Sequence, residues 1–220
     1  ATPRIRVADP VYNAQVICEQ AKEAAEHGAK IVVFPELCIT GYTCNDLFLQ
    51  ELLLEKAKEA LLTIAEETGQ LETLFLVGLP VDKDGRLYNV AAVLYRGRIL
   101  GMIPKKNIPM YAEFYEGRHF TPGEETVTEY RLGKQVIPFG SNLLFRCEEL
   151  PELILGCELC EDLWVAEPPS TSHALMGATV IANLSASNET VSKDDYRTLL
   201  VKASSARLLC GYIYTSAGEG

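Results

Sequence analysis

A short apolar run that ends in a proline and a glutamate, residues 31–36 (Ile-Val-Val-Phe-Pro-Glu), decides the fold of this chain. Its length and β-branched content are typical of a buried strand, and the proline marks where that strand ends. The segment before it, residues 10–27, has apolar residues at helical spacing, begins after the capping residue Asp9 and stops at Gly28. A helix followed by a wholly apolar strand predicts a layered α/β domain.

The rest of the chain repeats this alternation of helix and strand. Residues 46–68 carry Leu, Ile and Ala at spacings of three and four, which predicts a long amphipathic helix. Asp84-Gly85 predicts a hairpin turn, and Ser192 with Asp195 resembles a capping box that starts a helix ending at residue 210. The other predicted elements are strands at 30–34, 74–79, 86–95, 98–103, 143–147, 153–160, 178–184 and 211–215, and a short helix at 168–176.

Composition and charge exclude several classes of protein. The 220 residues carry 20 Lys and Arg against 30 Asp and Glu, a net charge of −10, so a basic nucleic-acid-binding face is not expected. No stretch approaches the roughly 20 apolar residues of a membrane span, and no secretory signal opens the sequence. The seven cysteines are odd in number and scattered, which favours free thiols in the cytoplasm over a disulfide framework.

Common catalytic and cofactor motifs are missing. The sequence has neither a G-x-x-x-x-G-K-[ST] loop nor a G-x-G-x-x-G loop for phosphate binding, and no G-x-S-x-G nucleophile elbow. Cys157 and Cys160 form a single C-x-x-C, but residues three apart in a strand point to opposite faces and would not easily hold one ion. The three histidines stand far apart in the sequence. We therefore expect no metal site and no cofactor in this chain.

Three polar residues each follow the end of a predicted apolar strand: Glu36, Lys105 and Cys160. A carboxylate, an ammonium and a thiol form a usable catalytic set. The thiolate is the nucleophile, a cation lowers the thiol pKa and holds an oxyanion, and the carboxylate moves protons. The spacing alone favours a simpler interpretation, one buried free cysteine and two surface charges, because sequence does not show whether the three residues converge.

The segments around these residues resemble the nitrilase, or carbon–nitrogen hydrolase, superfamily, whose members use a Glu-Lys-Cys triad in a four-layer αββα sandwich. Residues 33–37 (Val-Phe-Pro-Glu-Leu) with Gly41-Tyr42 resemble the Glu motif, residues 104–109 (Pro-Lys-Lys-Asn-Ile-Pro) the Lys motif, and residues 156–162 (Gly-Cys-Glu-Leu-Cys-Glu-Asp) the Cys motif. The motifs occur in the family's order over nearly the whole chain. The resemblance therefore implies an α/β fold of the nitrilase type.

Further residues narrow the resemblance to one branch. Cys-Glu-Asp-Leu-Trp at 160–164 replaces the Cys-Tyr-Asp-x-Arg-Phe-Pro run of many stand-alone amidases, and Asn-Leu-Ser-Ala-Ser at 183–187 precedes the last predicted helix. This combination is similar to the glutaminase domain of glutamine-dependent NAD⁺ synthetases, which releases ammonia from glutamine for an ATP-dependent synthetase domain. The resemblance implies that residues 1–220 are such a domain, apparently truncated at both ends and lacking the family's first central strand and the C-terminal synthetase domain. ATP, Mg²⁺ and deamido-NAD⁺ would bind that synthetase domain.

The resemblance assigns roles residue by residue. Cys160 is the expected nucleophile, Glu36 the general base and acid, Lys105 the oxyanion stabiliser, and Glu116 a supporting carboxylate near the lysine. The expected substrate-binding residues are Tyr111, Phe114, Glu161, Ser187 and Lys193, the last standing where relatives can carry Arg. The backbone N–H of Glu161 is a second candidate oxyanion donor.

Two alternatives stay open. One is a stand-alone amidase, such as an ω-amidase or a carbamoylase, which acts without ATP or a partner domain. The other is a catalytically inactive nitrilase-like module that serves only in assembly. A homo-oligomer is also expected, because members of the family generally pair through this sandwich. Glutamine, the synthetase domain and a second copy of the chain are therefore the expected partners, without nucleic acid or membrane.

Overall fold

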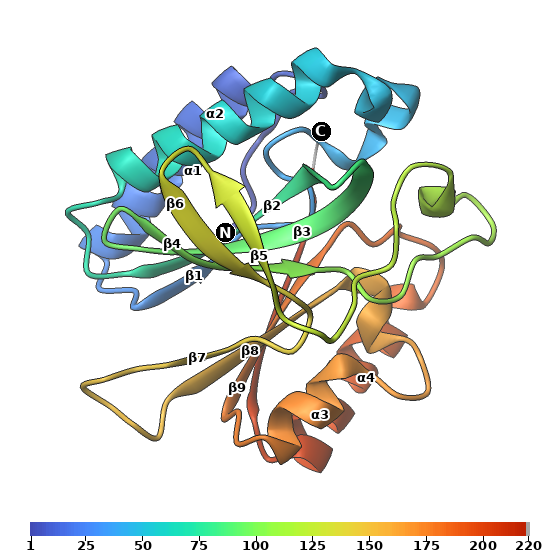
Figure 1. Ribbon diagram of the computed structural model, residues 1–220. Helices are drawn as coiled ribbons and strands as arrows, with labels where there is room; N and C mark the ends of the chain where they lie inside the picture. Colours follow the sequence, from blue (N-terminus) through green and yellow to red (C-terminus); the bar gives the residue numbers. More distant parts are fainter. Residues whose placement is uncertain (219–220) are drawn as a thin grey trace.

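Two β-sheets packed face to face, each covered on its outer side by two helices, make up the protein (Figure 1). A computed structural model describes residues 1–218. Helices α1 (Pro10–Glu26) and α2 (Glu51–Glu67) cover the first sheet, and α3 (Pro169–Leu175) and α4 (Lys193–Leu208) cover the second. The side chain of Asp9 caps α1 by accepting the N–H of Tyr12 at 3.1 Å, as its position before Pro10 predicts.

The first sheet has six strands in the order β1-β2-β3-β4-β6-β5. β1 pairs with β2 in parallel, β2, β3 and β4 form an antiparallel meander, and β6 pairs with β4 in parallel and with β5 in antiparallel orientation. The hairpin predicted at Asp84-Gly85 joins β2 and β3, and both residues have positive φ angles, as a tight hairpin turn requires. The strands span Ile31–Val33 (β1), Leu74–Lys83 (β2), Arg86–Tyr95 (β3), Arg98–Pro104 (β4), Thr128–Leu132 (β5) and Gln135–Phe139 (β6).

The second sheet has four strands in the order β10-β9-β8-β7. The three strands β8, β9 and β10 run parallel, and β7 is antiparallel to β8. Parallel strands place their carboxyl ends at one edge of a sheet, where ligand sites of open α/β folds usually lie. The strands span Leu144–Arg146 (β7), Ile154–Leu159 (β8), Val180–Ser185 (β9) and Gly211–Ser216 (β10).

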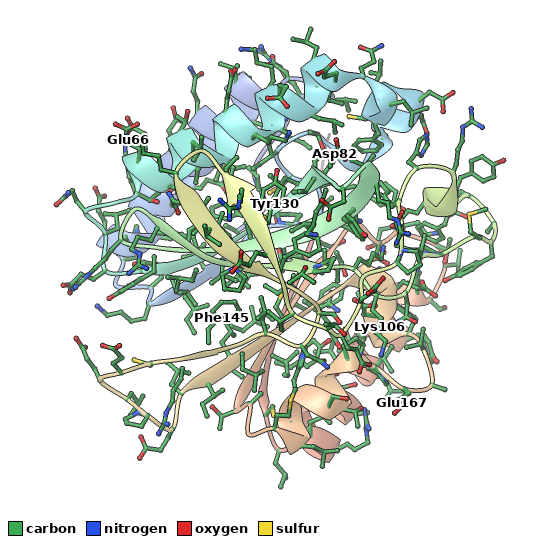
Figure 2. All side chains as sticks on the ribbon, viewed as in Figure 1. Glu66, Asp82, Lys106, Tyr130, Phe145 and Glu167 are labelled. Atoms are coloured by element: carbon green, nitrogen blue, oxygen red, sulfur yellow. The ribbon has the colours of Figure 1, made fainter. Side chains whose placement is uncertain are left out.

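An apolar layer joins the two sheets. Buried side chains of the first sheet pack against buried side chains of the second, and the partly buried ring of Phe145 lies between the sheets (Figure 2). Separate apolar clusters join each sheet to its own pair of helices. This layering agrees with the predicted four-layer αββα sandwich. The buried members of the inter-sheet layer are Val33, Leu76, Ala91, Val93, Ile103, Leu155, Cys157, Leu159, Ala182 and Leu184.

Two local expectations were wrong, and one hairpin was missed. The helix predicted from residue 46 begins at Glu51, because residues 42–49 form 3₁₀ turns interrupted at Asn45, whose φ of 49° and ψ of −131° are not helical. Ser192 makes no capping hydrogen bond, because its left-handed backbone (φ 65°) does not form the predicted capping box. The β5–β6 hairpin was not predicted at all, and its strands are short and include Pro138.

None of the helices within residues 1–218 combines the length and the apolar character needed to cross a membrane.

Candidate active site

Glu36 lies just beyond β1, in a turn that the second strand approaches very closely. Its N–H donates to the carbonyl of Ser185 at 3.3 Å, so the turn is fastened to the end of β9 in the other sheet. Gly78 of β2 lies directly beneath this turn: a Cβ atom at Gly78 would stand 2.3 Å from the Leu37 nitrogen and 2.6 Å from the Pro35 oxygen. Only glycine fits there, so β2 sets the position of the Glu36 backbone.

Lys105 follows β4 and is fully buried. Its N–H donates to the Asn89 carbonyl at 2.8 Å, which continues the pairing of β4 with β3 by one residue. Its ammonium lies 2.7 Å from Glu36 Oε1 and 2.6 Å from Glu116 Oε1, so one cation bridges two buried carboxylates. The neighbouring Lys106, labelled in Figure 2, is partly exposed and pairs instead with Glu125. The structure thus distinguishes the two lysines of the motif.

Hydrogen-bond donors other than Lys105 orient both carboxylates. Asn89 Nδ2 donates to Glu36 Oε1 at 2.7 Å and reaches Glu116 Oε2 at 3.4 Å. The hydroxyl of Tyr42 donates to Glu116 Oε1 at 2.7 Å, and the N–H of Ala186 donates to Glu36 Oε2 at 2.9 Å. Sequence reasoning missed Asn89 and quoted Tyr42 only as part of a motif. The available signal for Asn89 was a lone amide in an otherwise apolar stretch of strand.

Cys160 occupies a sharp corner between β8 and a 3₁₀ turn, η3 (Cys160–Leu163). Its φ of +41° is unusual for a residue with a side chain and costs about 1–3 kcal/mol, a strain typical of functional corners. The side chain is almost fully buried. The N–H of Asn107, two residues after Lys105, bonds the carboxylate of Asp162, two residues after Cys160, at 2.8 Å. Because the Lys105 ammonium also bonds Glu36 at 2.7 Å, the segments that follow these separate strands meet at one site.

The protonation states follow from burial and from this charge pattern. Burial raises the pKa of Glu36 to about 7, with Lys105 opposing and Glu116 reinforcing the shift. Burial also raises the pKa of Cys160 to about 12, and the charge of Glu36 adds to the rise. Burial alone would lower the pKa of Lys105, but the two carboxylates outweigh it and raise that pKa well above the ordinary value. Near pH 7 the site therefore holds a neutral thiol, an ammonium and a carboxyl group poised to accept a proton.

A pocket of about 400 Å³ opens onto Cys160. All five residues expected to bind substrate line it: Tyr111, Phe114, Glu161, Ser187 and Lys193. The hydroxyl of Tyr111 donates to Glu161 Oε2 at 2.8 Å, and the Lys193 ammonium lies 5.1 Å from the ring centre of Trp164 and 5.6 Å from that of Phe114. The pocket therefore presents one cation and one carboxylate beside the thiol, with aromatic walls. Sequence reasoning did not place Trp164 or Tyr196 in this wall.

The C-x-x-C pair does not form a joint site. Cys157 points into the apolar layer between the sheets, whereas Cys160 faces the pocket, and both are free thiols. Within residues 1–218, no cluster of three or more His, Cys, Asp or Glu side chains is arranged to hold a metal ion.

Comparisons with known proteins agree with this architecture. The carbon–nitrogen hydrolase family matches residues 1–215. The glutamine-dependent NAD(+) synthetase of Mycobacterium tuberculosis is 42% identical over 219 residues, covering all of this chain and 32% of the relative, so the chain spans about a third of the length of such curated relatives.

Solved structures give the same result. The crystal structure of a glutamine-dependent NAD(+) synthetase from Cytophaga hutchinsonii superposes with a TM-score of 0.88 at 30% identity, covering 99% of this chain and 35% of that one. An amidase from Nesterenkonia, at 20% identity and a TM-score of 0.75, covers all of this chain and 78% of its own, and shares the fold. From the family match, the close relatives and the shared fold, this chain belongs to the carbon–nitrogen hydrolase family.

Proposed function

We propose that this chain hydrolyses the side-chain amide of glutamine to glutamate and ammonia. The observation that carries the proposal is the buried ammonium of Lys105, held between Glu36 and Glu116 beside the Cys160 thiol at a pocket. Burying three ionisable groups together is costly for stability, and a cluster of this kind in a cleft is typical of a catalytic site. The relatives that match the chain are named glutamine-dependent NAD(+) synthetases, which supports glutamine as the substrate.

In the first half-reaction, the thiol of Cys160 attacks the amide carbon. Glu36, with a pKa raised to about 7, accepts the thiol proton as the C–S bond forms. The carbonyl oxygen becomes an oxyanion, stabilised by the Lys105 ammonium and the backbone N–H of Glu161. When the C–N bond breaks, Glu36 returns the proton to the nitrogen, so ammonia leaves and a γ-glutamyl thioester remains on Cys160.

The second half-reaction repeats the proton transfers with water. Glu36 removes a proton from a water molecule, which attacks the thioester carbon, and Lys105 again stabilises the oxyanion. Breaking the C–S bond releases glutamate, and the thiolate of Cys160 takes the proton held by Glu36. The active site is then back in its starting state. Glu116 keeps the Lys105 ammonium in place throughout, because it pairs with Lys105 at 2.6 Å.

The pocket suits a zwitterionic amino acid. Lys193 offers a cation for the α-carboxylate, and Glu161 offers a carboxylate for the α-ammonium. Tyr111 and Phe114 form an aromatic wall with their ring centres 5.6 Å apart, which packs against the aliphatic part of the substrate. Ser187 completes the lining on the side of β9. A charge-matched pocket of this kind explains how an acidic protein admits glutamine.

We further infer that the ammonia supplies an ATP-dependent synthetase domain that converts deamido-NAD⁺ to NAD⁺. The support is that the chain spans about a third of the relatives that carry this name. ATP, Mg²⁺ and deamido-NAD⁺ would bind that domain. The free state of the seven cysteines fits a cytoplasmic location. The homo-oligomer implied by the family resemblance stays a prediction, which light scattering on the full-length protein would test.

The test of the proposal replaces the nucleophile in the full-length protein. Cys160→Ala should reduce glutamine-dependent ammonia release by at least about a thousandfold, as loss of a covalent nucleophile does, and should leave ammonia-driven NAD⁺ synthesis intact. Cys157→Ala is the matched control, because it removes a thiol three residues away that faces the inter-sheet layer. Unchanged glutaminase activity in Cys160→Ala would eliminate the proposed mechanism.

The two alternatives have weaker support. A stand-alone amidase shares the fold, but the amidase structures at about 20% identity carry no information on substrate. Activity on simple aliphatic amides with none on glutamine would favour it. An inactive assembly module has no need of a fully buried Lys105–Glu36–Glu116 cluster. Failure of Cys160 to react with any glutamine-like electrophile would favour the inactive module.

A further inference from the structure

A third buried carboxylate, Asp162, lies two residues after the nucleophile and outside the Lys105 cluster. Its side chain is 1% exposed. Oδ1 accepts the backbone N–H of Asn107 and the side-chain amide of Asn107, both at 2.8 Å. Oδ2 accepts the N–H of Leu159 at 3.0 Å and that of Lys106 at 3.5 Å. All four contacts come from donors, so the site fits the ionised carboxylate.

These donors belong to the two segments that carry the catalytic side chains. Leu159 is the residue before Cys160 and ends β8. Lys106 and Asn107 directly follow Lys105, in the loop after β4. The two segments are 55 residues apart in sequence and belong to different sheets. One carboxylate therefore ties the corner at Cys160 to the loop at Lys105.

The two oxygens divide this work between them. Oδ1 holds only the Lys105 loop, through two 2.8 Å bonds from Asn107. Oδ2 is the only oxygen that holds the Cys160 corner, through Leu159 at 3.0 Å, and its contact with Lys106 is longer at 3.5 Å. A primary amide has only one oxygen, so it could satisfy one segment but would present N–H donors to the other. Burial raises the pKa of Asp162, and the bonds from Leu159 and Asn107 act against that rise. Losing the charge leaves buried backbone donors unsatisfied, which is costly.

We propose that Asp162 is a positioning residue that fixes the Cys160 thiol relative to the Lys105 ammonium. The inference rests on the proposed function, because it needs Cys160 as nucleophile and Lys105 as oxyanion stabiliser. The distance between these two groups matters most when the tetrahedral oxyanion forms, and Asp162 does not line the pocket. Its loss should therefore lower kcat and leave the KM for glutamine nearly unchanged.

The experiment compares two isosteric substitutions of buried carboxylates in the full-length protein. Asp162→Asn removes one oxygen from the link between the two segments. Glu158→Gln is the matched control, because Glu158 is equally buried. Its carboxylate accepts hydrogen bonds from the Ser170 N–H and the Tyr212 hydroxyl, which belong neither to the Lys105 loop nor to the Cys160 corner. Ammonia release gives kcat and KM, and peptide mass spectrometry gives the rate at which iodoacetamide alkylates Cys160. Thermal unfolding reports the stability of each variant.

We expect Asp162→Asn to lower kcat by about 30-fold with KM within about threefold, and to change the alkylation rate of Cys160. Glu158→Gln should keep kcat within about threefold even if it loses as much thermal stability. Asn107→Ala, which removes one donor and leaves the backbone bonds, should lower kcat by about 3- to 10-fold. The double variant Asp162→Asn with Asn107→Ala should be no worse than Asp162→Asn alone, because both act through one link.

Equal kcat losses in Asp162→Asn and Glu158→Gln, or fully additive losses in the double variant, would overturn the inference. If Asp162→Asn does not fold, Asn107→Ala decides, and an unchanged kcat there would overturn it. Failure of the proposed function gives a different result, since either the parent protein would release no ammonia from glutamine or Cys160→Ala would keep that activity. An inactive Cys160→Ala with a fully active Asp162→Asn refutes only the positioning role.

Discussion

Replacing Gly78 by alanine should displace Glu36, the proposed general base, through the backbone and without changing any side chain of the candidate site. The added Cβ would lie 2.3 Å from the Leu37 nitrogen, 2.6 Å from the Pro35 oxygen and 2.9 Å from the Glu36 carbonyl carbon, all backbone atoms that cannot rotate away. Restoring ordinary contact distances requires the turn at residues 35–37 to move by about 1 Å. Glu36 would move with it.

A displacement of this size exceeds what the cluster tolerates. Glu36 Oε1 stands 2.7 Å from Lys105 Nζ, and a shift of about 1 Å takes that contact beyond hydrogen-bonding distance. A misplacement of about 1 Å at a catalytic group costs about a hundredfold in rate. Overpacking at a buried site costs about 1–3 kcal/mol of folding stability, which lowers the melting temperature and leaves a folded protein to assay.

The assay is ammonia release from glutamine, with kcat expressed per folded molecule, the folded fraction being measured by circular dichroism at the assay temperature. Gly211→Ala is the control, because a Cβ at that glycine of β10 would meet its nearest neighbour at an ordinary 3.7 Å. Gly211→Ala should keep kcat within about threefold. A Gly78→Ala protein with kcat close to that of the parent would refute the claim that β2 sets the position of Glu36.

Two further predictions follow from the charges of the site. Because the base form of Glu36 is required and its pKa is raised to about 7, kcat/KM for glutamine should be low in acid and rise through about pH 7, as a rate profile would show; a profile flat from pH 5 to pH 9 contradicts this. Lys105→Met leaves Glu36 and Glu116 as buried carboxylates without a cation, which should cost about 3–5 kcal/mol in denaturant unfolding and abolish hydrolysis. Adding Glu116→Gln to Lys105→Met should restore part of the stability but no activity, and an unchanged stability in Lys105→Met would contradict the pairing.

Helices and strands were predicted from the sequence more reliably than the contacts between them. Each of Glu36, Lys105 and Cys160 was placed correctly after an apolar strand, because strand ends are read from local patterns. Their convergence depends on how two sheets pack, which no local pattern records, and spacing alone favoured a structural role. The roles of the three residues stay predictions until activity is measured.

The local errors have physical reasons. The helix was predicted to begin at Asp46, but Asp46 bonds Arg118 and His119 and belongs to the 3₁₀ turns of residues 42–49, so tertiary contacts override helix propensity there. The β5–β6 hairpin contains Pro138, which argues against a strand in general. It lies in β6, which pairs along its length with the edge strand β5 but with β4 at Phe139 alone. Asn89 escaped notice because a single amide in a strand gives no motif.

The candidate active site lies between the two sheets and takes residues from both. Glu36 and Lys105 follow strands of one sheet, whereas Cys160 and Ala186 follow strands of the other. The thickness of the apolar layer between the sheets thus sets the distance between Cys160 and the Glu36–Lys105 pair. Shortening a buried side chain of this layer, such as Val93, would let the two sheets move toward each other. The value of kcat should consequently be sensitive to the loss of methyl groups far from the substrate. Substitutions that raise folding stability by repacking this layer should therefore change kcat as well.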